Sequence, residues 1–386
     1  MTRALDAARA HDLGPVVAER HVVVCTGSGG VGKTTTAAAL AVGAADAGRR
    51  TIVLTIDPAR RLAQSLGLHA LDNSPRAVAD VPNLDAMMLD MRGTFDEVID
   101  RHAPSLARAQ AIRSNRFYKQ LSESLAGTQE YMAMEKLYDL HESQVYDCIV
   151  IDTPPTRNAL DFLDAPKRLT DFLEGRFLKM FLSPGLRAGK TIGRAATWGT
   201  GMFMKAASRI TGAGVLQDLA EFFHNFEGMY AGFKERAQAV YKLLQRPSSA
   251  FVVVATPEEP ALREARYFLQ RLAQDGMPTA GVVVNRTTPP PDPALGLPDQ
   301  ETIAAVVGPL AAGDPGQRAG AALLRLHHDR IDVAHRQRRA VSAALHGIDP
   351  RALVEVPLQS ADVHELGALR ALGSWLYGAG AGPDTT

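Results

Sequence analysis

Residues 22–36 are Val-Val-Val-Cys-Thr-Gly-Ser-Gly-Gly-Val-Gly-Lys-Thr-Thr-Thr, and this stretch decides the fold. The β-branched residues 22–26 are typical of a short buried strand, and the glycines that follow let the backbone turn tightly. The alanine-rich residues 37–47 then predict a helix. A strand, the spacing Gly-x4-Gly-Lys-Thr and a helix together form the phosphate-binding loop motif.

This loop predicts a site for a nucleoside triphosphate. Backbone N–H groups of such a loop, and the positive N-terminus of its helix, bind phosphate oxygens. Lys33 would reach the β- and γ-phosphates, and Thr34 would place its hydroxyl on Mg²⁺. A chance glycine-rich turn is the alternative, but the flanking strand and helix are both in register. The predicted nucleotide-binding residues of the loop are Gly27, Ser28, Gly29, Gly30, Val31, Gly32, Lys33, Thr34 and Thr35.

Composition narrows the function classes. The chain has 386 residues, with 42 basic and 42 acidic side chains and so no formal net charge. Without an overall positive field, no nucleic acid partner is expected. The two cysteines, Cys25 and Cys148, lie far apart in apolar runs, so the chain has no disulfide framework and no four-cysteine zinc site. No apolar run of about 18 residues occurs. We expect a cytoplasmic protein, at most peripheral to the membrane, with no stable membrane insertion.

Predicted strands alternate with helices along the chain. The strands are expected at residues 22–26, 51–56, 84–91, 146–151, 251–255, 281–285 and 353–356. This alternation favours an α/β fold with a doubly wound, mainly parallel sheet and ligands at the carboxyl ends of its strands. We expect an N-terminal extension at 1–20, a P-loop domain at 21–375 and a flexible tail at 376–386. The domain core would comprise about 21–93, 145–165, 247–290 and 350–375, with helical insertions at about 94–144, 166–246 and 299–347.

Two carboxylates follow predicted strands that come after the loop in the sequence. Asp57 follows the strand at 51–56, where it could orient an attacking water. Asp152 follows the strand at 146–151, where a Walker-B aspartate reaches Mg²⁺ directly or through water. Each alone is common, since Asp before Pro opens many turns. Together with Lys33 and Thr34 they form a coherent constellation for hydrolysis, with Asp57 and Lys33 as catalytic residues and Thr34, Asp57 and Asp152 around the metal.

The motifs Gly-Gly-Val-Gly-Lys-Thr-Thr, Asp-Pro-Ala (57–59) and Asp-Thr-Pro-Pro-Thr (152–156) resemble the ArsA/Get family of anion-pump and tail-anchored-protein-targeting ATPases. The resemblance extends from about residue 22 to residue 372. It implies a deviant Walker A, SIMIBI-type P-loop NTPase that uses ATP and Mg²⁺. It also implies that Asp57 is the water-activating aspartate of switch I and that Asp152 is the aspartate of switch II.

The resemblance assigns further nucleotide contacts. Pro-Glu at 257–258 matches a family motif whose glutamate contacts nucleotide, often across a dimer, which implies that role for Glu258. Asn285 would contact the adenine edge, and a turn residue in the left-handed region is its alternative. Pro357 and Leu358 would pack on the base.

Departures from the family pattern concern the partner and the cargo. The family's signature lysine, which reaches a partner's phosphates, is replaced here by Ser28. We therefore expect a dimer with a paralogous subunit that supplies this lysine, as in a bacterial branch of paired paralogues. Arg60 or Arg61 could substitute instead. The cysteine patterns for arsenite and for interfacial zinc are absent, so neither function is expected.

A helical insertion carries many methionine and aromatic side chains. Such side chains adapt to varied apolar partners, and in the targeting members this region binds a client. The alternative is that they form the core of the insertion. These residues are Phe172, Phe177, Met180, Phe181, Met202, Phe203, Met204, Phe222, Phe223, Phe226, Met229, Tyr230 and Phe233.

The sequence thus predicts a dimeric, Mg²⁺-dependent ATPase whose cycle changes the conformation of a helical subdomain, with a hydrophobic protein as its expected client. One alternative is a catalytically weak, ATP-gated scaffold, which the replacement at Ser28 favours. Another is a partitioning ATPase similar to ParA and MinD. The neutral charge and the Gly-Ala-rich C-terminus argue against the DNA and membrane surfaces that such proteins use.

Overall fold

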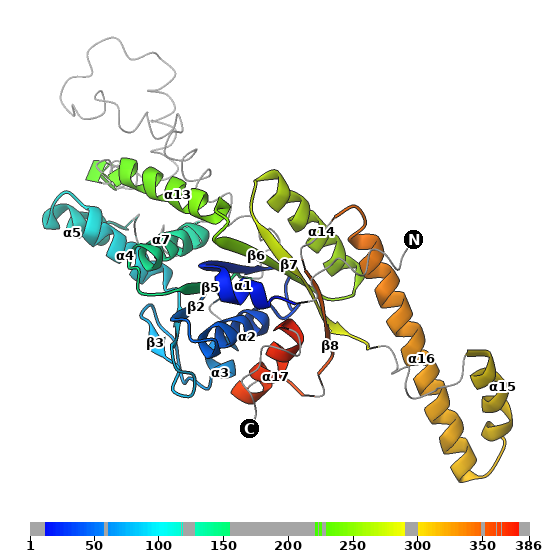
Figure 1. Cartoon of the computed structure of the whole chain (residues 1–386). Coiled ribbons are helices and arrows are strands. Elements are labelled where there is room, and N and C mark those ends of the chain that lie inside the picture. The colour runs from blue at the N-terminus through cyan, green and yellow to red at the C-terminus, as the bar shows by residue number, and fades with distance from the viewer. Residues whose placement is uncertain are drawn as a thin grey trace, which may run out of the picture.

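A computed structural model of the chain describes residues 12–57, 61–116, 118, 128–154, 221–222, 224–225, 229–289, 300–348, 352–359, 361–363 and 365–377. An eight-stranded sheet runs through these residues, and helices lie on both of its faces (Figure 1). The sheet has the strand order β3-β4-β2-β5-β1-β6-β7-β8. Every neighbouring pair is parallel except β3 with β4, as an α/β sheet built from crossover helices requires.

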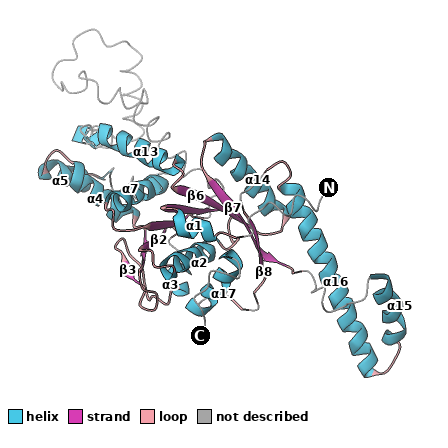
Figure 2. Ribbon diagram, viewed as in Figure 1, coloured by secondary structure: helices cyan, strands magenta, loops and turns pink. Residues whose placement is uncertain are grey.

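The strands are short, and the central ones are buried along their whole length, because helices cover both faces. Every residue of β1, β2, β5 and β6 is buried. Figure 2 shows these strands enclosed by helices. The strand bounds are β1 Val22–Thr26, β2 Thr51–Thr55, β3 Arg76–Ala77, β4 Leu84–Met88, β5 Cys148–Asp152, β6 Ser249–Ala255, β7 Thr279–Thr287 and β8 Leu353–Pro357.

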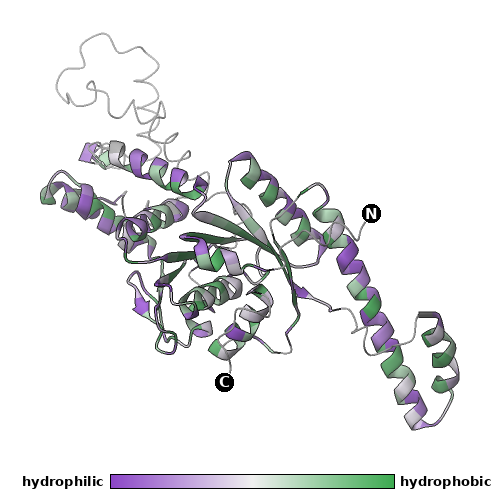
Figure 3. Cartoon of the chain, viewed as in Figure 1, coloured by the Kyte–Doolittle hydropathy of each residue, from purple (hydrophilic) through white to green (hydrophobic). Residues whose placement is uncertain are grey.

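Two apolar layers separate the sheet from its helices. On one face the layer is formed with α1 (Gly14–Glu19), α2 (Lys33–Asp46), α3 (Arg61–Ser65) and α17 (Leu366–Tyr377). On the other face it is formed with α4 (Met91–His102), α5 (Leu106–Ser114), α7 (Thr128–Glu142), α13 (Tyr230–Gln245) and α14 (Glu259–Gln274). Figure 3 shows the green, hydrophobic strands between mixed helices. The doubly wound α/β architecture predicted from the sequence is confirmed.

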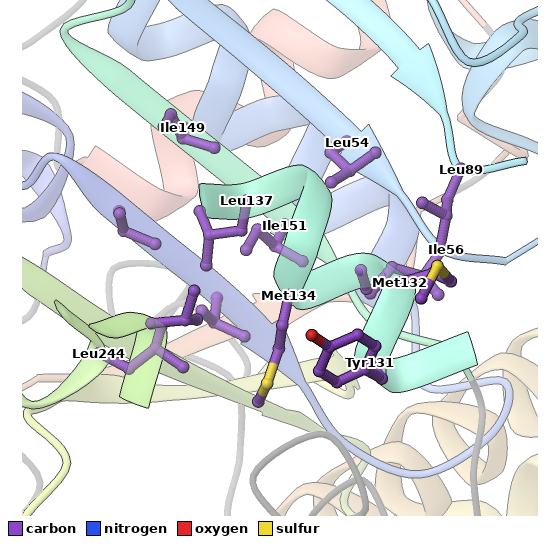
Figure 4. Packing of buried hydrophobic residues seen from close by; sticks show 14 of the residues in the cluster. Leu54, Ile56, Leu89, Tyr131, Met132, Met134, Leu137, Ile149, Ile151 and Leu244 are labelled. Atoms are coloured by element: carbon purple, nitrogen blue, oxygen red, sulfur yellow. The ribbon is translucent and has the colours of Figure 1, made fainter. Parts of the chain in front are cut away.

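Helix α7 packs on β5, the neighbour of the strand that leads into the phosphate loop. Figure 4 shows Met134 and Leu137 of α7 beside Ile149 and Ile151 of β5. Met132 of the same helix lies near Ile56, the residue that follows β2. A shift of α7 would therefore be transmitted to the ends of β2 and β5, because a close-packed interior transmits displacement.

A helical hairpin between β7 and β8 extends away from the sheet (Figure 1). It consists of α15 (Gln300–Ala311) and α16 (Pro315–Ala344), and a capping box at Asp314 starts the second helix. The hairpin has a small core of Ile303, Val307 and Ala321. Near its other end, α16 contributes Val341 to the main core.

Some predicted boundaries were wrong. The strand expected at 84–91 ends at Met88, because Asp90 caps the next helix by accepting a hydrogen bond from the Arg92 N–H. The helix expected at 37–47 begins at Lys33, inside the loop motif. Helix α17 runs to Tyr377, into the segment predicted to be a tail, and Leu376 is fully buried.

Other boundaries stay predictions. The two-residue β3 is exposed and was not predicted, since it has no apolar pattern. The proposed domain limits remain predictions, and most of the insertion at 166–246 lies outside the described residues. Within the described residues, no helix combines the length and the apolar character needed to cross a bilayer.

Candidate nucleotide site at the carboxyl ends of the central strands

Glycine is required at two positions of the loop between β1 and α2. The backbone φ is +152° at Gly27 and +99° at Gly32, in a region that other residues rarely adopt. A Cβ at Gly27 would lie 2.1 Å from the carbonyl oxygen of Val254, and a Cβ at Gly32 would lie 2.3 Å from Nδ2 of Asn285. Only a chain without side chains at these points can pass so close to its neighbours. Between them, Gly29 and Gly30 are exposed, so this part of the loop is open to a ligand.

Asn285, at the carboxyl end of β7, supports the loop from outside. Its Nδ2 donates to the carbonyl oxygen of Val31 at 2.9 Å, and its Oδ1 accepts from the Arg286 N–H at 2.9 Å. The residue in the left-handed region is Arg286, with φ +61°, and not Asn285. The role of Asn285 at the adenine edge stays a prediction, and the structure adds a role in shaping the loop.

Lys33 opens helix α2 and is only 5% exposed. Its Nζ donates to the carbonyl oxygen of Ser28 at 2.8 Å, so the side chain folds back over the loop. Burial lowers the pKa of Lys33, and the charges of Asp152 and Asp57 act in the opposite direction. A phosphate oxygen beside this ammonium would compensate electrostatically for the water that the group loses on burial.

Asp152 ends β5 and is fully buried. Its Oδ2 accepts from Oγ1 of Thr34 at 2.8 Å and from Oγ1 of Thr55 at 2.9 Å. Its Oδ1 is buried and has no hydrogen-bond partner among the described residues. Burial raises the pKa of Asp152 to about 6, although the two hydroxyls and the charge of Lys33 lower it. A buried carboxylate oxygen without a partner is costly unless a cation or its water occupies the site.

Asp57 follows β2 and is half-buried. Its backbone N–H donates to Oγ1 of Thr55 at 3.2 Å, and its charge raises the pKa values of Lys33 and Asp152. Just before it, the carbonyl oxygen of Ile56 accepts from Nε2 of Gln129 on α7 at 2.8 Å. Residues 58–60, which complete switch I, lie outside the described part of the chain.

The donors around Asp152 fit a magnesium ion. Mg²⁺ prefers oxygen ligands and is usually held by one or two carboxylates together with phosphates and waters. The Thr34 hydroxyl and the unpartnered Oδ1 of Asp152 are such oxygens, and Lys33 marks the phosphate side. In the described residues, no cluster of three or more His, Cys, Asp or Glu side chains could hold a metal alone. With oxygens from Thr34 and Asp152, the site fits a Mg²⁺ ion whose other ligands are phosphates and waters.

The remaining predicted contacts lie at the carboxyl ends of β6 and β8. Glu258 is exposed in the residue before α14, just beyond β6. Pro357 ends β8 and is half-buried. Leu358 is held by a hydrogen bond from its N–H to the carbonyl oxygen of Thr287 at 2.9 Å, while its side chain is 68% exposed. Contacts of these three residues with nucleotide stay predictions.

The structure also describes some of the residues that were predicted to matter for the partner subunit and for the client. Ser28 is half-buried and places a neutral side chain where the family has lysine. Arg61 is exposed at the start of α3, and Arg60 lies outside the described residues.

Of the methionine and aromatic side chains in the insertion, Phe222, Met229 and Phe233 are buried in the main core. The other members of that set lie outside the residues whose side chains are described.

Two functional candidates were missed by sequence reasoning. Thr55 had a signal, since it is the last polar residue of a buried strand, two positions before Asp57. Gln129 had none, because its contact with Ile56 joins residues 73 positions apart. Thr55 contacts Asp152 and the backbone of Asp57, which the motifs did identify, and Gln129 contacts the residue just before Asp57.

Comparisons with known proteins agree with this geometry. A family model described as anion-transporting ATPase matches residues 20–294. The ATPase GET3 of Malassezia globosa is 29% identical over 269 residues, which cover 70% of this chain and 73% of that protein. The ATPase ASNA1 homolog 1 of Paramecium tetraurelia is 26% identical over 274 residues, covering 69% of this chain and 74% of that protein. The ATPase ASNA1 homolog of Entamoeba histolytica is 28% identical over 278 residues, covering 68% and 75%. Since the family model spans well over half of its length, the chain belongs to the anion-transporting ATPase family.

Proposed function

We propose that this ATPase is Mg²⁺-dependent and couples ATP binding and hydrolysis to movement of its helical subdomain. The buried carboxylate of Asp152, held by the Thr34 hydroxyl beside Lys33, is the observation that carries the proposal. A buried carboxylate oxygen without a partner, beside a phosphate loop, calls for an explanation, and a bound cation supplies one. The ATP-gated scaffold would share this geometry, so turnover must decide between the two.

Each residue has a distinct part in the proposed reaction. The loop N–H groups and Lys33 would bind the β- and γ-phosphates of ATP, and Thr34 and Asp152 would hold Mg²⁺. When bound, Mg²⁺ supplies positive charge that offsets the charge of the phosphates. The Asp57 carboxylate would accept a hydrogen bond from the attacking water and orient it in line with the leaving group. Asn285, Pro357 and Leu358 would surround the base.

Helix α7 could transmit the conformational change that accompanies hydrolysis to the helical subdomain. Gln129 of α7 binds the backbone of Ile56, next to the proposed water-orienting Asp57. Further along α7, Glu135 forms a buried ion pair with Arg236 of α13, with Oε2 and Nε 2.7 Å apart. Breaking such a pair leaves a buried charge without compensation, so the two helices are expected to move together. A displacement of switch I would then shift both helices and any client that they bind.

The partner is proposed to be a paralogous subunit. Ser28 cannot supply a cation to a facing active site, whereas such a cation can accelerate phosphoryl transfer by about 10³–10⁵-fold. A dimer of two identical copies would lack this contribution in both sites. The curated relatives are named ATPase GET3 and ASNA1, and a hydrophobic protein client remains part of the proposal on the strength of that family membership.

The test is ATP hydrolysis by the purified chain with Mg²⁺, alone and mixed with a lysine-bearing paralogue. Single-turnover phosphate release is measured for the wild type, Lys33→Ala and Asp57→Asn. Lys33→Ala should lose nucleotide binding, while Asp57→Asn should bind ATP normally and turn over at least about 100-fold more slowly. Equal loss of binding in both variants would show that Asp57 does not orient water. Absence of turnover in the wild type, alone and mixed, would favour the ATP-gated scaffold. Full activity of the chain alone would remove the need for the paralogue.

A further inference from the structure

The hydroxyl of Thr55 lies between the two switch aspartates. Thr55 is the last residue of β2 and is only 1% exposed, so no solvent replaces its hydrogen bonds. Its Oγ1 is 2.9 Å from Oδ2 of Asp152 and 3.2 Å from the backbone nitrogen of Asp57. The carbonyl oxygen of Asp57 is farther away, at 3.4 Å.

The donors and acceptors of these groups fix the direction of the hydrogen bonds. A hydroxyl has one proton, and a carboxylate accepts it more strongly than a carbonyl oxygen does. The Thr55 hydroxyl therefore donates to Asp152, at the shorter distance, and accepts from the N–H of Asp57. The result is a chain of two hydrogen bonds that leads from the switch I backbone to the switch II carboxylate.

Thr55 also determines which oxygen of Asp152 remains available. Thr34 donates to Oδ2 from helix α2, and Thr55 donates to the same oxygen from strand β2. With Oδ2 held from two sides, the buried Oδ1 is left as the acceptor for a further ligand. The backbone of the next residue reinforces this alignment, since the Ile56 N–H donates to the Asp152 carbonyl oxygen at 3.0 Å.

We infer that Thr55 is a positioning residue that couples Asp57 to Asp152, so that the water-orienting and metal-holding carboxylates are set together. The inference rests on the proposed function, because it assigns those roles to the two aspartates. A merely structural role is the alternative: a buried threonine at a strand end satisfies nearby polar groups, and its loss would lower stability alone. The two roles differ in what they do to Mg²⁺ dependence.

The test compares three variants of the full-length chain. Thr55→Val keeps the shape and removes the hydroxyl, and Thr55→Ser restores it. Thr51→Val is the matched control, because Thr51 is a fully buried threonine of the same strand whose Oγ1 donates to the Arg49 carbonyl oxygen at 3.0 Å, at the opposite end. The measurements are ADP affinity by calorimetry with EDTA and across a range of Mg²⁺ concentrations, ATP turnover, and hydrogen exchange of the Asp57 amide without nucleotide.

For Thr55→Val, the Mg²⁺ concentration that gives half of the maximal effect on ADP affinity should be about 10-fold higher than in the wild type. The reason is that the buried carboxylate of Asp152 loses one of its hydrogen-bond donors. ADP affinity in EDTA should not change, and turnover should fall through kcat more than through KM. The Asp57 amide should exchange faster. Thr55→Ser and Thr51→Val should match the wild type in all four measurements.

Three results would overturn the inference: Thr55→Val with wild-type Mg²⁺ dependence and wild-type exchange at Asp57, Thr51→Val with the same defect, or no rescue by Thr55→Ser. If the wild type does not hydrolyse ATP, the proposed function fails separately, and the ADP-binding and exchange measurements still decide the role of Thr55.

Discussion

Replacing Asp152 with asparagine should make the nucleotide-free protein more stable near neutral pH and abolish its response to Mg²⁺. The carboxylate is fully buried, and one of its oxygens has no hydrogen-bond partner among the described residues. An asparagine has nearly the same shape and no charge to desolvate. The substitution therefore removes a charge that the folded protein holds at a cost.

The magnitude follows from proton linkage. Burial raises the pKa of Asp152 from 3.8 to about 6, so between these values the native state binds a proton that the unfolded chain releases. The stabilisation from this proton is fully present below pH 3.8 and is lost as the pH rises through 6. The complete loss corresponds to about 3 kcal/mol, of which about 1 kcal/mol falls between pH 5 and pH 8.

Urea unfolding in EDTA, at intervals from pH 5 to pH 8, measures this loss. The free energy of unfolding of Asp152→Asn minus that of the wild type should increase by about 1 kcal/mol over the range. Any cost of the substitution that does not depend on pH cancels in this comparison. Glu301→Gln, which removes an exposed carboxylate of α15, is the control. Mg²⁺ with ADP should then raise the unfolding midpoint of the wild type and leave Asp152→Asn unchanged relative to ADP alone.

A constant difference between the two proteins across this pH range would refute the reasoning. It would mean that Asp152 keeps its charge in the folded state without a desolvation cost. The unpartnered Oδ1 would then no longer point to a cation, and the assignment of Asp152 to the metal would lose its physical basis.

The other predictions concern Asn285, which supports the phosphate loop, and Ser28, which lies within it. Asn285→Ala removes the hydrogen bond to Val31, which should lower the affinity for ATP and GTP alike by about 5-fold. If the side chain also contacts adenine, the variant should in addition lose its preference for ATP. The control is Gln245→Ala, which removes a similar amide-to-carbonyl bond to Asp275 and should bind both nucleotides normally, and unchanged affinity in Asn285→Ala would show that the loop needs no support. Ser28→Lys introduces the missing cation and should raise ATP turnover of the chain alone by at least about 10-fold, as measured by steady-state phosphate release. Ser28→Met, with a long uncharged side chain, is its control, and equal rates for the two would disprove a role for charge at this position.

The parts of the site that the sequence predicted are those carried by short contiguous patterns. The loop glycines, Lys33 and Thr34 are identified by their spacing alone, and Asp57 and Asp152 each end an apolar run. Parallel strands bring their carboxyl ends to one edge, so the convergence of these residues follows from the fold class. The doubly wound sheet was predictable for the same reason.

Contacts made by folding were not predictable in this way. Gln129 binds Ile56 because α7 packs on β5 and its first turn reaches the residue after β2, and no local pattern marks that pairing. Asn285 was expected at the base, and its bond to Val31 depends on the close approach that Gly32 permits. Helix α4 starts where Asp90 accepts from a backbone N–H, although the apolar pattern continued past that point. Capping and tertiary contacts override periodicity in each case.

The two ends of helix α16 should differ in their resistance to local unfolding. Helix α16 has 30 residues, about 45 Å of helix. Near its end, Val341 belongs to the main core, whereas its beginning is held by a three-residue cluster with α15. The distal turns can therefore fray and reform on their own, at a small fraction of the free energy of global unfolding. Such an arm can be deformed by a collision or a crosslink without disturbing the strands that carry the phosphate loop.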